Sequence, residues 1–327
     1  MHESLDALDH IRLNFSQESL LILNFALAFI MFGVALEIKI EHFSKIINNP
    51  KSAIIGFGSQ FLALPFITFL LVIAFQKYLS PTMALGMILV AACPGGNISN
   101  FISSLSKANV ALSVSLTAIA TIGAVFLTPL NFALWGKLAI NFYAHANADT
   151  LVRPLEIDTI QMFQSVFIIL GIPLISGIAF NTKFPVLTEK IVRTVKRLSI
   201  LIFAVIVIIA LAKNFDHFKT AIQFIFIIVL IHNAVALGIG YSLGILFKRP
   251  RPDRRTLSIE TGIQNSGLAL VLIFNPKIFP PEMELGGMAV IAAWWGIWHI
   301  LSGLAVAGLW TGFNFGLRRK KADIKKD

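Results

Sequence analysis

The stretch IETGIQNSG, residues 259–267, places a single carboxylate, Glu260, among residues that are apolar or uncharged. An ionised carboxylate near the centre of a bilayer costs about 2.5–3.5 kcal/mol even on a lenient insertion scale, so it persists only with a partner such as a cation. No Lys or Arg lies in this stretch to act as the partner. Glu260 is therefore the first candidate functional residue.

The composition around this stretch is typical of a membrane protein. Hydrophobic residues make up 56% of the chain, charged residues make up 13%, and the mean hydropathy is +0.79. These values lie outside the range of soluble domains. At about 20 apolar residues per transmembrane helix, the sequence predicts about nine spans. They cover roughly residues 19–38, 52–75, 82–106, 110–136, 159–180, 198–212, 221–247, 255–275 and 287–315.

The net charge of +10 is informative through its distribution. If the spans alternate strictly in direction, one side of the membrane holds 20 of the 27 Lys and Arg residues and the other side holds 7. The positive-inside rule then places the N-terminus outside and the C-terminus in the cytoplasm. The basic excess thus indicates orientation and predicts no nucleic-acid partner. Residues 1–18 would form an extracytoplasmic segment, and residues 316–327 a basic cytoplasmic tail near lipid headgroups.

A second unusual stretch, CPGGNISN at residues 93–100, interrupts the third span. Pro94 lacks an amide hydrogen, and the two glycines after it are unfavourable in a helix while permitting unusual backbone angles. Unwound backbone at membrane depth must be satisfied by protein, water or a ligand, so the break is a candidate binding site. The expected helix-break residues are Pro94, Gly95, Gly96 and Gly262.

The two interrupted segments belong to the third and eighth spans, so they run in opposite directions. NISN at 97–100 also aligns weakly with GIQN at 262–265. An inverted repeat whose broken helices meet near the midplane has this arrangement. The alternative is that small and polar residues here only let helices pack closely, but packing does not require a carboxylate beside two amides. We therefore expect an all-α polytopic membrane protein with two discontinuous crossing helices. The expected repeats cover about 19–136 and 198–315, the linking helix about 159–180, and the single transporter domain 19–315.

The polar residues of these spans supply oxygen atoms of the kinds that a hard cation such as sodium prefers, by the logic that governs calcium and magnesium. Ser113 and Thr117 lie four residues apart, so two hydroxyls share one face of the fourth span. Gln60 adds an amide from the second span. These groups predict a cation site beside Glu260.

In its motifs the chain resembles the bile acid:sodium symporter family, in its bacterial branch. The resemblance covers about residues 19 to 315, and the set of motifs is specific although each one alone is weak. Bacterial members often have ten spans, so this chain is expected to lack the first and to start outside. The motifs are MFG at 31–33, QF at 60–61 with Pro65, CPGG at 93–96, SN at 99–100, NVALS at 109–113, HN at 232–233, Glu260 with Gly262, QNSG at 264–267, and WH at 298–299 with SG at 302–303.

The resemblance implies two sodium ions and an organic anion as ligands. The first sodium site would use Ser99, Asn100, Ser113, Thr117 and Glu260. The second would use the side chains of Gln60, Glu260 and Gln264 with the backbone carbonyls of Thr261 and Ile263. The substrate contacts would be Asn97, Asn265 and His299. An intramembrane His is also often a hydrogen-bonded packing residue, and this alternative stays open for His299 and His232. Relatives usually carry Thr where this chain has Asn97, and Asn where it has Ile300, so the resemblance does not name the substrate.

The expected function is sodium-coupled import of a carboxylated organic anion, bile acid-like or a small hydroxy or keto acid, across the cell membrane by alternating access. By resemblance, spans one, five and six would form a panel that rocks against a core built on the crossed helices. The alternatives are a proton- or cation-coupled antiporter of related fold that uses Glu260 as a titrating carrier, and a passive channel. An enzyme is not expected, because paired carboxylates with a nucleophile, a His-rich metal set and a phosphate loop are all missing from the sequence. The oligomeric state stays open.

Overall fold

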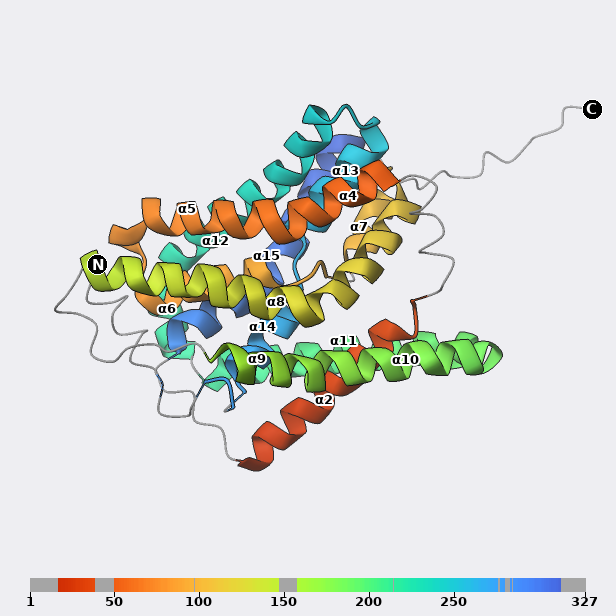
Figure 1. The fold of residues 1–327 in the computed structure, drawn as a ribbon, viewed down its shortest axis with the longest axis horizontal. Coiled ribbons are helices and arrows are strands. Elements are labelled where there is room, and N and C mark those ends of the chain that lie inside the picture. The colour runs from red at the N-terminus through yellow and green to blue at the C-terminus, as the bar shows by residue number, and fades with distance from the viewer. Residues whose placement is uncertain are drawn as a thin grey trace, which may run out of the picture.

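The computed structural model describes residues 17–38, 50–96, 98–146, 158–213, 215–275, 277–279, 283 and 285–312. Every regular element in this part of the chain is a helix (Figure 1). The elements are α2 (Gln17–Ala35), α4 (Pro50–Gly58), a π-helical segment (Ser59–Ala63), α5 (Leu64–Ala74), a short 3-10 turn (Gln76–Tyr78), α6 (Pro81–Ala92), α7 (Ile98–Leu105), α8 (Val110–Ala146), α9 (Thr159–Val166), a second π-helical segment (Phe167–Gly171), α10 (Ile172–Lys183), α11 (Pro185–Lys213), α12 (Phe215–Leu246), α13 (Arg251–Gly262), α14 (Ser266–Ile273) and α15 (Gly286–Thr311). Nearly all of the expected segment 1–18, the whole of the tail 316–327 and Asn97 lie outside the described residues.

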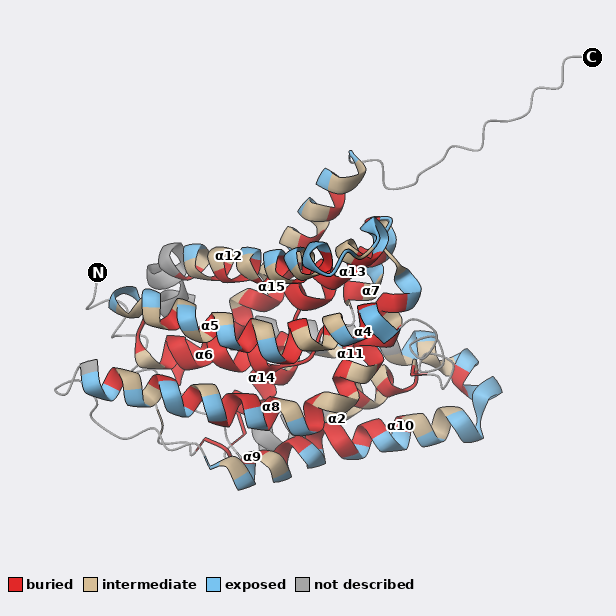
Figure 2. Ribbon diagram, turned by 45° about the horizontal axis from the view of Figure 1, so that its top comes forward, coloured by how far each residue is buried: buried red, intermediate tan, exposed pale blue. Residues whose placement is uncertain are grey.

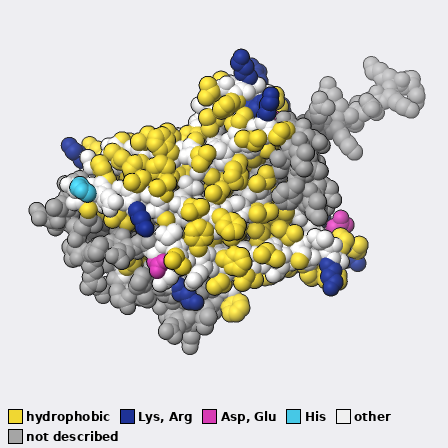
Figure 3. Space-filling view, in the orientation of Figure 1, with side chains coloured by type: hydrophobic (Ala, Val, Ile, Leu, Met, Phe, Trp, Pro, Cys, Tyr) yellow, Lys and Arg dark blue, Asp and Glu magenta, His cyan; other side chains and the backbone are white. Residues whose placement is uncertain are grey.

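The helices have the length and composition of membrane spans. Figure 3 shows one face on which hydrophobic side chains form a broad band, with most of the visible Lys and Arg side chains toward its edges. The predicted class of polytopic helical membrane protein is confirmed, while the full number of spans stays a prediction. Among the described residues, five helices can cross a bilayer by length and hydropathy: Pro50–Ala74, Val110–His145, Thr159–Lys183, Ile225–Leu246 and Gly286–Thr311.

Two helices extend beyond the spans that hydropathy predicts. The fourth span was expected to end near residue 136, but α8 continues to Ala146. The sixth was expected at 198–212, but α11 begins at Pro185. The first half of α11 carries charged residues such as Glu189 and Arg193, so it is helical without being apolar. Hydropathy detects only the half that is apolar enough to lie in lipid.

A π-helical segment widens the helix just before Pro65. Leu64 donates its N–H to the carbonyl of Ser59, which is the i to i−5 pattern of a π-helix. The wider turn accommodates the proline ring, which would clash with the preceding turn of a regular α-helix. A second π-helical segment stands in the same relation to Pro173. The first of these segments contains Gln60, one of the predicted sodium ligands.

The helices divide into a group around α2 and a buried interior. In Figure 1, α2 lies beside α10 and α11. These helices approach closely at small residues: a Cβ at Gly177 would come 2.5 Å from the Cβ of Ala35, and one at Gly33 would come 2.9 Å from Ser199 Oγ. They correspond to the spans expected to form the panel.

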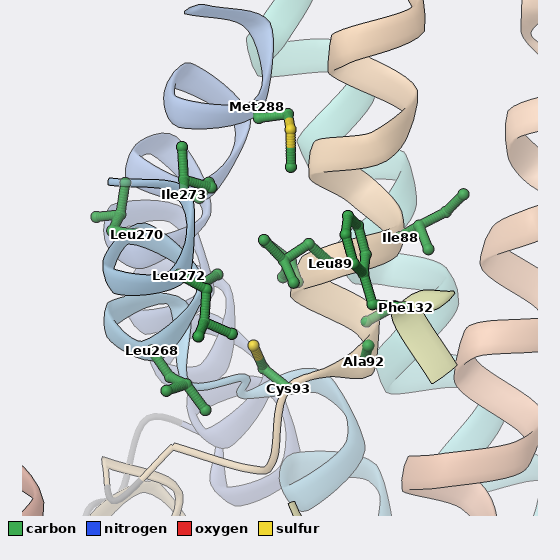
Figure 4. Close-up of a cluster of buried hydrophobic side chains, with 14 of the residues drawn as sticks. Ile88, Leu89, Ala92, Cys93, Phe132, Leu268, Leu270, Leu272, Ile273 and Met288 are labelled. Carbon is green, nitrogen blue, oxygen red and sulfur yellow. The ribbon is translucent and has the colours of Figure 1, made fainter. Parts of the chain in front are cut away.

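The interior is built on α6 and α14, whose residues are almost all buried (Figure 2). Figure 4 shows Leu268 and Leu272 of α14 turned toward Leu89 and Cys93 at the end of α6. This apolar core lies directly beside the first helix break, at Cys93. The breaks therefore sit on a packed support.

Small residues let α12 lie directly on the backbone of α13, the helix that carries Glu260. A Cβ at Gly240 would come 2.2 Å from the carbonyl oxygen of Leu257. Ser258 Oγ, in the next position of α13, donates a 2.7 Å hydrogen bond to the carbonyl of Leu237. The backbones of α12 and α13 are thus in direct contact.

Candidate functional site

The two helix breaks cross and bond to each other through their backbones. The N–H of Gly96 donates to the carbonyl of Ile263 at 2.7 Å, and the N–H of Asn265 donates to the carbonyl of Pro94 at 2.8 Å. Together they form an isolated antiparallel bridge between the breaks. Backbone groups that the helices leave unpaired are therefore satisfied within the protein, as membrane depth requires. The predicted meeting of the two discontinuous helices is confirmed.

Glycine is required at this crossing because the chains touch. A Cβ at Gly96 would come 2.9 Å from the carbonyl oxygen of Gln264, and one at Gly95 would come 3.2 Å from Glu260 Oε2. Gly262 has a different role from the predicted one. It is the last residue of α13 rather than part of the break, and its missing side chain makes room for Leu237, whose Cδ2 would lie 2.4 Å from a Cβ there.

The weak alignment of NISN with GIQN stays a prediction, because Asn97 lies outside the described residues. α14 begins at Ser266, immediately after Asn265, and the described part of α7 runs from Ile98 to Leu105. The bridge between the two breaks pairs Gly95 with Gln264.

The Glu260 carboxylate lies at the crossing among hydroxyl groups from two helices. Its Oε1 accepts a 2.6 Å hydrogen bond from Ser99 Oγ of α7 and another from Ser113 Oγ of α8. Its Oε2 accepts from Thr117 Oγ1 of α8 at 2.9 Å. Glu260 is only 5% exposed. These neutral donors satisfy the hydrogen-bonding capacity of the carboxylate, but they do not balance its charge.

Asn100 completes the cluster predicted for the first sodium site. Its Oδ1 lies 2.9 Å from Ser113 Oγ and 3.3 Å from Thr117 Oγ1, within hydrogen-bonding distance of the two hydroxyls that also reach Glu260. All of the side chains predicted for that site are thus joined in one hydrogen-bonded network around Glu260. Their role as cation ligands stays a prediction.

The residues predicted for the second sodium site also meet at the crossing. Gln60 and Gln264 form a reciprocal amide pair, with Gln60 Nε2 donating to Gln264 Oε1 at 2.7 Å and Gln264 Nε2 donating back at 3.2 Å. Gln264 Nε2 also donates to the carbonyl of Thr261 at 2.6 Å, while the carbonyl of Ile263 accepts from Gly96. Each of these oxygens already accepts one hydrogen bond and has a second lone pair.

The predicted substrate contacts are less well defined by the geometry. Asn265 caps α14, because its Oδ1 accepts the N–H of Leu268 at 3.0 Å. His299 is 5% exposed, and within the described part of the chain its Nδ1 has no hydrogen-bond partner. Asn97 lies outside the described residues. Of the predicted contacts, the structure therefore describes the side-chain amide of Asn265 at the start of α14 and the buried imidazole of His299.

The contacts of His232 fit the packing alternative, but its Nδ1 has no hydrogen-bond partner among the described residues, so its role stays open. Its Nε2 lies 2.8 Å from Thr68 Oγ1, and its ring contacts Trp295 edge-on, with centroids 4.6 Å apart. A hydrogen bond to α5 and an aromatic contact to α15 are what a structural histidine would make.

Sequence reasoning missed residues that hold the end of α13 in place. Asn233 Nδ2 donates to the carbonyl of Gly262 at 2.7 Å, and Ser302 Oγ donates to Asn233 Oδ1. Ser59 Oγ and Thr261 Oγ1 lie 2.7 Å apart in a further hydrogen bond. The motifs HN and SG contain Asn233 and Ser302, so the sequence drew attention to these residues, but it did not show which groups they bond to.

Comparison with known proteins agrees with this geometry. The model of the Sodium Bile acid symporter family matches residues 24–221. An uncharacterized sodium-dependent transporter of Bacillus subtilis is 31% identical over 288 residues, covering 87% of this chain and 81% of the relative. A probable chloroplastic sodium/metabolite cotransporter of Oryza sativa is 32% identical, covering 82% of this chain and 62% of the relative. Sodium/bile acid cotransporter 4 of Homo sapiens is 29% identical, covering 80% of this chain and 57% of the relative.

Proposed function

Because the chain belongs to the Sodium Bile acid symporter family, we propose that it is a symporter that imports a carboxylated organic anion together with sodium. The substrate is bile acid-like or a small hydroxy or keto acid. Relatives named as sodium-dependent transporters and sodium/metabolite cotransporters support sodium as the coupling ion. The unit that carries this activity is the single domain 19–315.

The observation that carries the proposal is Glu260, a buried carboxylate at a helix crossing whose hydrogen-bonding partners are hydroxyls. A charge in this position needs a counter-charge. A hydroxyl is both a donor and an acceptor, so the groups that donate to Glu260 can turn their lone pairs toward a cation. Sodium beside Glu260 would then find carboxylate, hydroxyl and amide oxygens in one place.

We place two ions at the crossing, one on each side of Glu260. The first is held by the cluster of Ser99, Asn100, Ser113 and Thr117, and the second by the amide pair Gln60 and Gln264 with the carbonyls of Thr261 and Ile263. For the second ion, the amide pair opens so that both side-chain oxygens face the cation. One carboxylate shared by two cations would also explain why the site contains no basic side chain.

The organic anion binds beside the crossing, where α7 and α14 begin. Helix starts carry a partial positive charge, which suits a carboxylate. We assign three side chains as its contacts: the amide nitrogen of Asn265, the side chain of Asn97, and His299 Nδ1, which has no hydrogen-bond partner among the described residues. Sodium and substrate would then bind close to each other, both at the crossing of the two helix breaks.

Coupling follows from the position of the ions between two discontinuous helices. Sodium ties α7 and α8 to α13 through Glu260, which orders the half-helix starts that receive the anion. Such a coupling is reciprocal: the anion raises the affinity for sodium by the same factor. The group α2, α9, α10 and α11 forms the panel against which the core rocks, with the N-terminus outside and the C-terminus in the cytoplasm.

A thermal-shift screen of the purified protein in sodium and in potassium tests the proposal. At a concentration 100 times its Kd, one ion contributes about 2.7 kcal/mol of stability, so sodium should raise the melting temperature while potassium does not. Organic carboxylates should raise it further only in sodium. Equal melting curves in the two salts would contradict the proposal.

Uptake into proteoliposomes separates the remaining alternatives. A symporter accumulates the hit compound against its gradient when sodium is outside and no pH gradient exists. Uptake that requires a pH gradient would instead indicate the antiporter, and equilibration without accumulation would indicate a channel.

A further inference from the structure

A second buried carboxylate, Asp253, lies in the first turn of α13, outside the proposed ion sites. It is 2% exposed. Its Oδ2 accepts a 2.6 Å hydrogen bond from Ser52 Oγ of α4, and its Oδ1 accepts a 2.9 Å hydrogen bond from Asn109 Nδ2, just before α8. An acidic residue in a first helical turn needs only the helix dipole and water for its stability. Burial against two other helices requires a further explanation.

Asn109 fastens the start of α8 to the start of α13. Its Oδ1 caps α8 by accepting the N–H of Leu112 at 3.1 Å. Its backbone N–H donates to the carbonyl of Pro252 at 3.3 Å, and its carbonyl accepts from Thr256 Oγ1 at 3.0 Å. The Asn109 carbonyl also accepts the N–H of Ser113. Together with the bond to Asp253, every polar group of Asn109 is used, and three of its five hydrogen bonds go to α13.

The three helices that meet at Asp253 are the ones that carry most of the proposed sodium ligands. Glu260 lies seven residues after Asp253 on α13, and Gln60 lies eight after Ser52 on the α4 span. Ser113 and Thr117 lie four and eight residues after Asn109. At 3.6 residues per turn, these separations amount to about one to two turns, so the ligands sit about 6–12 Å further along the same helices. Figure 1 shows α4 and α13 side by side at this end of the molecule.

Apolar packing holds the same helices together but cannot fix how they slide. Ala53 of α4, Leu112 and Leu116 of α8 and Leu257 of α13 form a small buried cluster next to Asp253. The hydrophobic effect is not directional. A carboxylate with two defined donors is directional, so it specifies one register among the three helices.

We propose that Asp253 is a positioning residue for the sodium sites. It holds the starts of α4, α8 and α13 in a fixed register, and so sets the distances between the ligand oxygens that these spans carry one to two turns further on. This inference rests on the proposed sodium-coupled function. A small hard ion demands ligands placed within about half an ångström, and Asp253 supplies that placement through stiff helices.

The test is a sodium titration of the melting temperature of the full-length protein against a potassium background. Asp253→Ala should raise the sodium concentration for half-maximal stabilisation by about tenfold, because the ligand helices lose their common register and binding weakens by about 1.4 kcal/mol. Asp253→Asn should stay close to the wild type, because the new amide can accept from Asn109 and donate to Ser52 Oγ. If Asp253→Asn loses sodium affinity as fully as Asp253→Ala, the charge of Asp253 matters rather than its hydrogen bonds, and the proposed positioning role is wrong.

Two further variants keep the test decisive if Asp253→Ala does not fold. Asn109→Asp retains the α8 cap, since Asp is a good N-cap residue, but it places two carboxylates face to face and should weaken sodium binding at least as much. Ser258→Ala removes a buried hydrogen bond from the same helix to α12 and should lower the melting temperature equally in both salts. An unchanged sodium midpoint in Asn109→Asp and Asp253→Ala would overturn the inference. A wild type without any sodium response would instead overturn the proposed function.

Discussion

Glu260 is stable in its position because the surrounding residues replace water. Ser99 and Thr117 donate to opposite oxygens of the carboxylate, and the crossing excludes solvent. Neutral donors lower the cost of burial without removing it, since desolvation of a charge in a low-dielectric interior amounts to several kcal/mol. An ionised carboxylate in this environment needs a counter-charge to offset its desolvation cost.

Substitution of Glu260 should therefore separate stability from ion binding. Glu260→Gln keeps the shape of the side chain and an oxygen that can accept from Ser113, but it removes the charge. Loss of a buried charge partner costs about 3 kcal/mol or more, so sodium should no longer stabilise the variant at concentrations up to about 100-fold above the wild-type midpoint. In potassium, the variant should melt at or above the wild-type temperature. A normal sodium titration of Glu260→Gln, followed by thermal shift, would show that the ions bind elsewhere.

At the residue scale, the sequence predicted the site better than its supports. Ser113, Thr117 and Glu260 could be grouped because hydroxyls and a carboxylate in apolar spans have few explanations, whereas Ser99 was named only through the family resemblance. Asp253 could not be recognised, because a charged residue beside several arginines at a helix start resembles a solvated surface group. Its partner Ser52 is 201 positions away, and neither spacing nor composition reports such a contact.

At the scale of elements, the first break followed from proline and glycine, but the packing of α13 did not. Pro94 and its glycines predict a break because helix interiors reject them. The glycines of α12, by contrast, lie in a continuous helix, and only the structure shows that Gly240 touches the backbone of α13. The π-helical segment at Ser59–Ala63 was also missed, since Pro65 in a helix indicates a distortion without indicating its form.

The contact between α12 and α13 can be tested with a matched pair of glycine variants. Gly240→Ala would place a Cβ 2.2 Å from the carbonyl oxygen of Leu257, so the helices must separate. Such overpacking costs about 1–3 kcal/mol and should lower the melting temperature by several degrees. Because α13 carries Glu260, the sodium-dependent part of the stabilisation should fall as well.

The control for this variant is Gly238→Ala, two residues earlier on the same helix, where a Cβ would meet nothing within 4 Å. Alanine favours a helix over glycine by about 1 kcal/mol, so this protein should melt at the wild-type temperature or slightly above it. Identical melting temperatures for the two variants would show that α12 and α13 are not in backbone contact.

At the scale of the whole molecule, the architecture is a packed interior with broken helices and a separate group of continuous ones. α6 and α14 are surrounded on all sides, whereas α2, α10 and α11 contact one another at small residues. Under the proposed alternating access, the interior would hold the ligands and the group around α2 would move against it. The sequence predicted this division only through the family resemblance, because composition does not distinguish panel from core.

The orientation in the membrane can be tested on the two ends of one helical span. Lys51 lies at the start of α4, Lys77 lies just after the end of α5, and both are exposed. The helix between them, Pro50–Ala74, has 25 residues and is about 37 Å long, enough to cross a bilayer core of about 30 Å. The excess of basic residues on the Lys51 side predicts that this end is cytoplasmic.

In intact cells, Lys77→Cys should react with a membrane-impermeant maleimide, and Lys51→Cys should react only after permeabilisation. The native Cys93 is buried, so the wild type supplies the unlabelled control. The reverse pattern would invert the proposed topology, while net transport would stay inward, because the sodium gradient sets its direction.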